Sequence, residues 1–172
     1  TGLTLVNDLP QPWQVQVRTR VVDEAGQVFH EQHQHVTVAA DGHLVIEPES
    51  VPAGAAAVVV DADGLRGVRW VLPDLELAHP TAIVSVDSVS GDGATATVAI
   101  TAHTLVRDLA LLAETHPNLP DAIVDHQLLT LLPGEHATLT VAGVGNIDLD
   151  PATWAGLLTS GTPLEVVEGA RD

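Results

Sequence analysis

The segment 13–21 alternates between apolar and polar side chains, and this pattern constrains the fold more than any other feature of the sequence. A period of two residues with one polar side is typical of a half-buried antiparallel strand. The chain is therefore expected to form sheets that bury one face. The expected apolar face carries Trp13, Val15, Val17, Thr19 and Val21, and the expected polar face carries Gln14, Gln16, Arg18 and Arg20.

Short β-type segments separated by turn signals continue along both halves of the chain. The segment 105–113 is ambiguous, because its apolar spacing also permits a short helix. Asp41-Gly42 predicts a hairpin, since this pair tolerates the positive φ of primed turns. The other candidate strands lie at 5–8, 27–38, 44–47, 56–61 and 67–72 in the first half, and at 82–87, 94–102, 128–132, 136–141 and 163–167 in the second.

About seven strand candidates lie on either side of the segment 73–80, which begins and ends with proline. Seven short strands are what an immunoglobulin-like sandwich needs. Near the end, Asp150 followed by Pro151 is typical of a helix start. We predict an all-β fold of two tandem immunoglobulin-like β-sandwiches with a short C-terminal helix. The predicted domains are 1–75, 76–145 and a C-terminal extension, 146–172.

The composition excludes several classes of function. The 172 residues carry 23 acidic side chains, 6 Arg and no Lys, for a formal net charge of −17. Such a surface repels phosphate backbones and anionic lipids, so we expect no nucleic-acid partner and no membrane partner. Without Cys there is no thiolate nucleophile and no thiolate metal site. The compartment stays open, with the cytoplasm favoured over secretion. Because the chain opens on Thr1-Gly2 instead of Met, we expect a fragment of a longer polypeptide.

The sequence contains no recognisable catalytic constellation, and we assign no catalytic, cofactor-binding or metal-binding residue. The strongest candidates for a metal site are His30, His33, His35 and His43. His33 and His35 share a strand face, a spacing that can hold zinc if a neighbouring strand adds His43 as a third ligand. A hydrated strand face is the interpretation that we favour, because Gln residues alternate with these histidines. Whether the four histidines bind metal stays open.

Two other patterns are weak indications of calcium binding and of sugar binding. Asp61-Ala62-Asp63-Gly64 is similar to the start of a calcium loop, but Leu72 stands at the twelfth position where a bidentate Glu is needed, so a plain turn is expected. The three tryptophans could stack on sugars. We expect Trp13 in the core, Trp70 at the junction between the sandwiches and Trp154 as the anchor of the terminal helix.

The order of three short signatures carries a resemblance to a known family. Leu5-Val6-Asn7-Asp8 opens the first half, 102–109 reads Ala-His-Thr-Leu-Val-Arg-Asp-Leu, and Leu131-Leu132-Pro133-Gly134-Glu135 follows. This succession resembles the C-terminal immunoglobulin-like domains of β-mannosidases in glycoside hydrolase family 2, over about residues 3–142. In that family a segment Asp-Asn-aromatic-Phe-Asp commonly precedes the last signature. The matching stretch, 126–130, keeps the apolar residues but lacks the aromatic and acidic ones.

The resemblance implies a whole enzyme that hydrolyses terminal β-mannosyl or similar linkages with retention. Such an enzyme uses two Glu of a (β/α)₈ barrel about 5–5.5 Å apart. No barrel is encoded here, so no catalytic role is transferred to this chain, and Glu135 is expected to accept backbone hydrogen bonds in a turn. The implied function is non-catalytic support, with the catalytic domain of the same polypeptide as partner and the glycan substrate as a further one. The alternatives are a carbohydrate-binding module and an interaction domain of a surface protein. No cofactor is expected.

Overall fold

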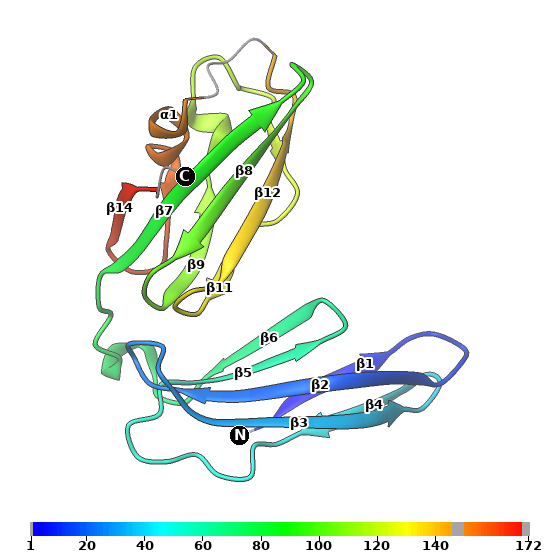
Figure 1. The fold of residues 1–172 in the computed structure, drawn as a ribbon. Helices are drawn as coiled ribbons and strands as arrows, with labels where there is room; N and C mark the ends of the chain where they lie inside the picture. The colour runs from blue at the N-terminus through cyan, green and yellow to red at the C-terminus, as the bar shows by residue number, and fades with distance from the viewer. Residues whose placement is uncertain (1, 146–149, 170–172) are drawn as a thin grey trace. The chain divides into compact units, whose positions relative to one another are not determined.

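The computed structural model describes residues 2–145 and 150–169, and the chain divides into two compact units, 1–78 and 79–172 (Figure 1). Both units are built from several mainly antiparallel sheets, so the predicted all-β sandwich architecture is confirmed. The domain ranges 1–75, 76–145 and 146–172 and the immunoglobulin-like topology stay predictions. Residues 146–149, at the start of the predicted extension, lie outside the described residues.

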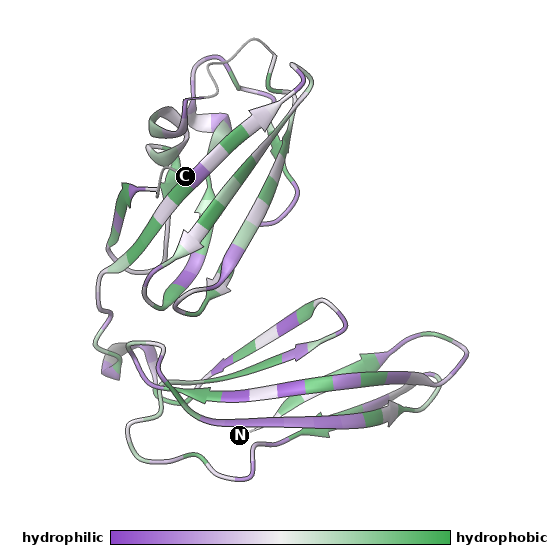
Figure 2. Ribbon diagram, viewed as in Figure 1, coloured by the Kyte–Doolittle hydropathy of each residue, from purple (hydrophilic) through white to green (hydrophobic). Residues whose placement is uncertain are grey.

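The first unit packs a four-stranded sheet, in the order β3-β2-β5-β6, against the two-stranded sheet β1-β4. Aliphatic side chains of β2 and β5 form its core, and residues of β1 and β4 pack against them. Figure 2 shows hydrophobic and hydrophilic residues alternating along β2, as the period of two requires. The strands are β1 (Leu3–Asn7), β2 (Trp13–Val22), β3 (Val28–Val38), β4 (Gly42–Ile46), β5 (Ala57–Ala62) and β6 (Leu65–Trp70), and a 3₁₀ turn η1 (Asp74–Glu76) follows.

The predicted hairpin at Asp41-Gly42 is wrong. Strand β4 does not pair with β3 but with β1, so the turn carries the chain from one sheet of the sandwich to the other. Asp41 has φ +48°, whereas the glycines with positive φ do not include Gly42, so the turn is not of the primed hairpin type. The physical reason is burial. Leu44 and Ile46 reach the core of the unit because β4 lies in the two-stranded sheet with β1.

The second unit packs a five-stranded sheet, in the order β10-β12-β8-β7-β14, against the three-stranded sheet β11-β9-β13. Its core contains Ile100, Leu109, Leu139 and Trp154, all fully buried. The pair β14–β7 is parallel, and the other pairs are antiparallel. The strands are β7 (Ala82–Gly91), β8 (Thr95–Ala102), β9 (Val106–Leu111), β10 (Ile123–Val124), β11 (Leu129–Leu131), β12 (His136–Ala142), β13 (Leu158–Thr159) and β14 (Leu164–Glu168), with a 3₁₀ turn η2 (Ala113–Thr115).

The ambiguous segment 105–113 forms strand β9, and a bulge explains its helix-like spacing. Val106 lies opposite Leu131 and Leu109 opposite Leu129, so three steps on β9 match two on β11. Asp108 takes up the extra residue with φ +52°. A bulge of this kind lets residues three apart face the same side of a sheet. Val106 and Leu109 are both fully buried for this reason.

The predicted terminal helix is present as α1 (Pro151–Ala155), which begins directly after Asp150. Trp154 is completely buried in the core of the second unit, so it anchors the helix as expected. In the described part of the chain no helix has the length and apolar character needed to cross a membrane.

The core of the second unit predicts a large difference between two aliphatic side chains on neighbouring strands. Leu139 on β12 is 1% exposed, whereas Ile123 on β10 is 71% exposed. Leu139→Ala should lower the free energy of unfolding by about 2–5 kcal/mol, because it leaves a cavity. The control Ile123→Ala should change it by about 0.5 kcal/mol or less. Urea unfolding followed by circular dichroism measures both, and equal effects would contradict the assigned core.

Candidate functional site

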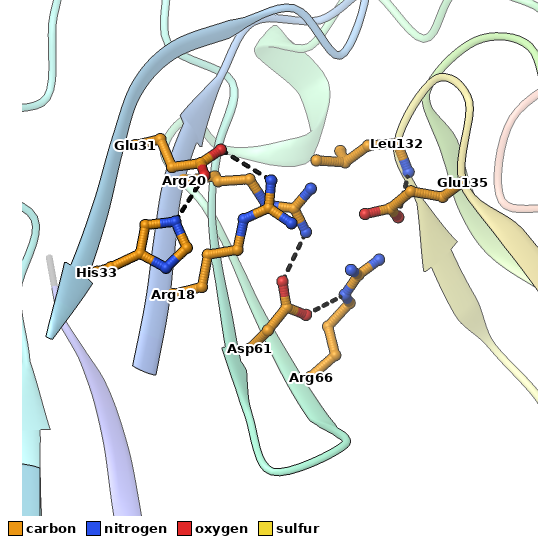
Figure 3. Close-up of polar contacts among 8 residues, drawn as sticks. All are labelled: Arg18, Arg20, Glu31, His33, Asp61, Arg66, Leu132 and Glu135. Atoms are coloured by element: carbon orange, nitrogen blue, oxygen red, sulfur yellow. Dashed lines mark hydrogen bonds and ion pairs between the residues drawn. The ribbon is translucent and has the colours of Figure 1, made fainter. Parts of the chain in front are cut away.

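The polar face of the four-stranded sheet in the first unit carries a charged cluster (Figure 3). Arg18 on β2 donates to Glu31 on the neighbouring strand β3, with 2.8 Å between Nη2 and Oε2. The Nε2 atom of His33 lies 2.8 Å from Oε1 of the same carboxylate. The strand period places Glu31 and His33 on one face of β3, so one carboxylate binds partners on two strands.

A second set of ion pairs lies on the same face. Arg20 on β2 donates to Asp61 on β5, at 2.6 Å from Nη2 to Oδ2, and the Nε atom of Arg66 on β6 lies 2.6 Å from Oδ1. The Arg20 side chain is only 4% exposed, a degree of burial that a guanidinium tolerates when it is paired. Both sets together are called the arginine–carboxylate cluster: Arg18, Arg20, Glu31, His33, Asp61 and Arg66.

The electrostatics around Glu31 oppose a role for its carboxyl group as a general acid near neutral pH. Hydrogen bonds from Arg18, and then from His33, lower the pKa of Glu31 from 4.5 to about 2. A carboxyl group with so low a pKa carries no proton at neutral pH and is a weak base. Glu31 can therefore hold β2 and β3 together, but it is poorly suited to donate a proton to a glycosidic oxygen.

Two carboxyl groups of the second unit also have lowered pKa values. Backbone hydrogen bonds from Thr95 and Ala94 lower the pKa of Asp92. Burial raises the pKa of Asp125, but hydrogen bonds from Thr140 and His126 outweigh it, so the pKa is lowered overall. Both side chains stabilise backbone: Asp92 closes the turn between β7 and β8, and Asp125 binds the amide of Thr140 on β12.

The four candidate metal-binding histidines do not converge. His33 and His35 lie on the polar face of β3, as expected, whereas His30 lies on the opposite face, across from Val21. His43 belongs to β4, which pairs with β1, so the third ligand expected from a strand adjacent to β3 is not supplied. Within residues 2–145 and 150–169 no group of three or more His, Cys, Asp or Glu side chains could hold a metal ion.

The signature Leu131–Glu135 forms a tight turn that Glu135 closes. Glu135 donates its backbone N–H to the carbonyl of Leu132, and its carboxylate accepts from the Leu132 amide at 2.9 Å (Figure 3). Pro133 and Gly134 occupy the central positions, and Gly134 has φ +80°, as the third residue of a type II turn requires. The expectation that Glu135 accepts a backbone hydrogen bond in a turn is confirmed.

A polar network on the five-stranded sheet was not anticipated from the sequence. Asp87 on β7 accepts from Ser85 at 2.7 Å and from Thr101 on β8 at 2.5 Å. The chain of contacts continues from Thr101 to His136 on β12 at 2.7 Å and from Ser85 to His103 at 3.1 Å. The alternation of Ser85 and Asp87 was visible, but their partners depend on cross-strand register, which a single sequence does not reveal.

The network contains Ser, His and Asp but does not have the order of a catalytic triad. In a triad the histidine accepts the serine proton and the aspartate binds the other imidazole nitrogen. Here the Ser85 hydroxyl donates to Asp87, so His103 can only donate to Ser85. Ser85 is also buried. The arrangement therefore fastens three strands together and supplies no activated nucleophile.

The pattern at 61–64 and Trp13 both have structural roles. Asp63 and Gly64, both with positive φ, are the two central residues of the hairpin between β5 and β6, so the expected plain turn is confirmed. Trp13 packs against the core of the first unit, also as expected. Trp70 is partly buried on β6, and its expected place at the junction of the sandwiches stays a prediction.

Comparisons with known proteins give a likeness of fold. No family model and no curated protein sequence matches the chain. Among solved structures, the β-D-mannosidase of Dictyoglomus thermophilum matches 96% of this chain, with a TM-score of 0.71 and 13% identity. The chain shares the fold of one part of a β-mannosidase. The expected resemblance is thus confirmed at the level of the fold.

A second similar structure is the exo-chitosanase of Amycolatopsis orientalis, which matches 81% of the chain with a TM-score of 0.54 and 15% identity. The matches cover 20% of the β-mannosidase chain and 22% of the exo-chitosanase chain. The present chain therefore spans about a fifth of the length of these proteins.

The arginine–carboxylate cluster predicts an unusually acidic Glu31. In the folded protein its carboxyl group should titrate at about pH 2, and Arg18→Gln should raise that midpoint towards 4.5. Because the folded pKa lies below the unfolded one, the stabilisation is present above pH 4.5 and is lost as the pH falls towards 2. NMR titration of the side-chain carboxyl measures the midpoint. Arg66→Gln is the matched control, since Arg66 pairs with Asp61, and an equal shift in both variants would contradict the assignment.

The turn closed by Glu135 predicts a specific effect on stability. Glu135→Ala removes the acceptor of the Leu132 amide and should lower the free energy of unfolding by about 1.5–3 kcal/mol. Glu135→Gln keeps an acceptor oxygen at the same place and should retain most of this stability. Thermal or urea unfolding compares the two. If Glu135→Gln loses as much as Glu135→Ala, the carboxylate does not act through this hydrogen bond.

Proposed function

We propose that the chain is the non-catalytic C-terminal β-sandwich region of a β-mannosidase-like glycoside hydrolase of family 2. It supports a catalytic barrel in the same polypeptide, and that barrel hydrolyses terminal β-mannosyl or similar β-glycosidic linkages. The observation that carries the proposal is the fold match over 96% of this chain to about one fifth of a β-mannosidase. Nearly all of this chain matches only a small part of a longer enzyme chain, which favours a region of a larger enzyme over a separate enzyme.

Four carboxyl groups, those of Glu31, Asp92, Asp125 and Glu135, support a non-catalytic role. A retaining glycosidase needs one carboxylic acid with a raised pKa and a second carboxylate about 5–5.5 Å away. The pKa shifts at Glu31, Asp92 and Asp125 are all downward. Glu135 is bound to the backbone of its own turn. These groups are therefore arranged to stabilise strands and turns.

The packing of the aromatic residues favours this proposal over an independent carbohydrate-binding module. Sugar-binding surfaces present aromatic rings whose faces are open to the pyranose ring. Trp154 is fully buried, so its ring is not available for stacking, and Trp13 is partly buried and packs against the core. With only Phe29 and Trp70 as further aromatic residues, the chain lacks the material for a broad stacking platform.

The proposal predicts that the purified chain hydrolyses no aryl β-mannoside. Glu31, Asp92 and Asp125 have lowered pKa values and Glu135 is bound to its own turn, so release of p-nitrophenol should equal that of buffer. The complete polypeptide, assayed at the same molar concentration, serves as the positive control. Turnover that co-purifies with the isolated chain, and is retained after unrelated purification steps, would refute the proposal.

Affinity electrophoresis separates the proposal from the binding-module alternative. Native gels that contain mannan should not retard the chain relative to gels without polysaccharide. Retardation that increases with mannan concentration would favour a carbohydrate-binding module.

A further inference from the structure

The inner face of β3 is unusually polar for a sandwich core. The strand period directs His30, Gln32 and Gln34 inward, on the side of Val36, while Glu31 and the other histidines of the strand face outward. Val36 packs against the core of the first unit, but the three polar side chains take positions where a sandwich normally places aliphatic residues.

Register brings a fourth polar side chain to the same place. Thr19 on β2 lies directly opposite Gln32, and His30 lies opposite Val21, the next inward-facing residue of β2. The Cβ atoms of directly opposite residues such as Thr19 and Gln32 are about 4.5–5.5 Å apart, and diagonal neighbours such as Thr19 and His30 are about 7–8 Å apart, within reach of a long side chain. Thr19, His30 and Gln32 therefore form a compact set, called here the inner polar cluster. Thr19 is completely buried.

Each member of the inner polar cluster has a buried polar atom that no protein group satisfies. These atoms are Oγ1 of Thr19, Nε2 of His30 and Oε1 of Gln32. The Oε2 atom of Glu49 lies 3.9 Å from Nε2 of His30, beyond hydrogen-bonding distance. Leaving one buried polar atom unsatisfied is costly, and three neighbouring ones would use much of the stability of a small domain.

We propose that the inner polar cluster binds ordered internal water. A water molecule offers two donors and two acceptors, and buried waters typically make about three hydrogen bonds to otherwise unsatisfied groups. The cluster has the matching chemistry: Gln32 Oε1 accepts, the Thr19 hydroxyl donates or accepts, and His30 Nε2 does either according to its tautomer.

A metal ion suits this cluster less well than water. Zinc in proteins is held by three or four Cys, His or carboxylate ligands, and calcium by six to eight oxygens that include carboxylates. The inner polar cluster supplies one imidazole and two neutral oxygens, and Glu49 lies at its margin. These neutral groups fit a neutral ligand.

The segment between β4 and β5 bounds this site. Val51 and Ala55 of that segment pack into the same core as Val21, the strand neighbour of Thr19. Glu49 lies in the same segment and reaches towards His30. Bound water would therefore link the segment 47–56, which has no strand or helix, to the β2–β3 pair.

The substitution Thr19→Val tests the proposal, because it replaces the hydroxyl by a methyl group of nearly the same shape. If Thr19 binds internal water, the substitution should raise the unfolding equilibrium constant about fivefold or more. If the hydroxyl is merely unsatisfied, removing it should leave the constant unchanged or lower it. Thr37→Val is the matched control: Thr37 lies exposed on the opposite face of β3, and its replacement should change the constant by about twofold or less.

A second measurement needs no variant and remains decisive if Thr19→Val does not fold. Rotating-frame NMR experiments on the wild-type chain detect magnetisation transfer from long-lived bound water to nearby protons. The Thr19 methyl group and the His30 ring should show water cross-peaks, and the methyl group of Thr37 should show none from long-lived water. The absence of a water cross-peak at Thr19, or a Thr19→Val variant at least as stable as the wild type, would overturn the proposal.

Discussion

The packing of aliphatic side chains between two sheets is the interaction on which each unit depends. The chain has three Trp and one Phe, so Val, Ala, Leu and Ile must supply nearly all of the buried apolar surface. β-Branched residues suit this task, because they fill a pleated, half-buried surface with little loss of rotamer freedom. The result is a sandwich in which β2 and β5 bury aliphatic side chains in the core, whereas the inner face of β3 carries His30, Gln32 and Gln34. Most charged side chains lie on the outer faces and in the turns.

Charged side chains on the outer faces of the sheets connect neighbouring strands. In the first unit, Arg18 and Arg20 connect β2 to the carboxylates of Glu31 and Asp61 on the two flanking strands. In the second unit, Asp87 gathers hydroxyl groups from β7 and β8. Glu31, which accepts hydrogen bonds from Arg18 and His33, is stabilised in its charged form, which is the opposite of what a general acid needs. The contacts that join Glu31 to β2 therefore lower its pKa and make it unsuited to donate a proton in glycoside cleavage.

The local sequence pattern predicted where most strands lie, but it could not predict which strands pair with one another. The alternation at 13–21, the start of the helix at Pro151 and the turn at Glu135 depend on neighbouring residues alone, and all three are present. Strand partners are set by burial across the whole unit, so β4 joined β1 and the turn at Asp41 did not form a hairpin. The bulge at Asp108 places buried residues of β9 three positions apart, so the segment has the apolar spacing of a helix in the sequence.

The candidate sites also depend partly on local sequence, which can be read, and partly on strand pairing, which cannot. A single sequence indicates that His33 and His35 share a face, but it cannot show that His43 lies in another sheet, since that depends on register and sheet order. The Ser85–Asp87–Thr101 network and the inner polar cluster at Thr19 were missed for the same reason. Each is assembled from two or more strands whose pairing has no local signal.

The central claim is that this region stabilises an enzyme whose chemistry lies elsewhere in the polypeptide. The most direct test compares kcat and Tm of the complete polypeptide with those of its Glu31→Gln and Glu135→Gln variants. The claim predicts kcat within about twofold of wild type, with any effect confined to a lower Tm. A fall in kcat of about 10²–10⁴-fold at unchanged Tm is the size expected for loss of a catalytic acid or base, and it would contradict the claim.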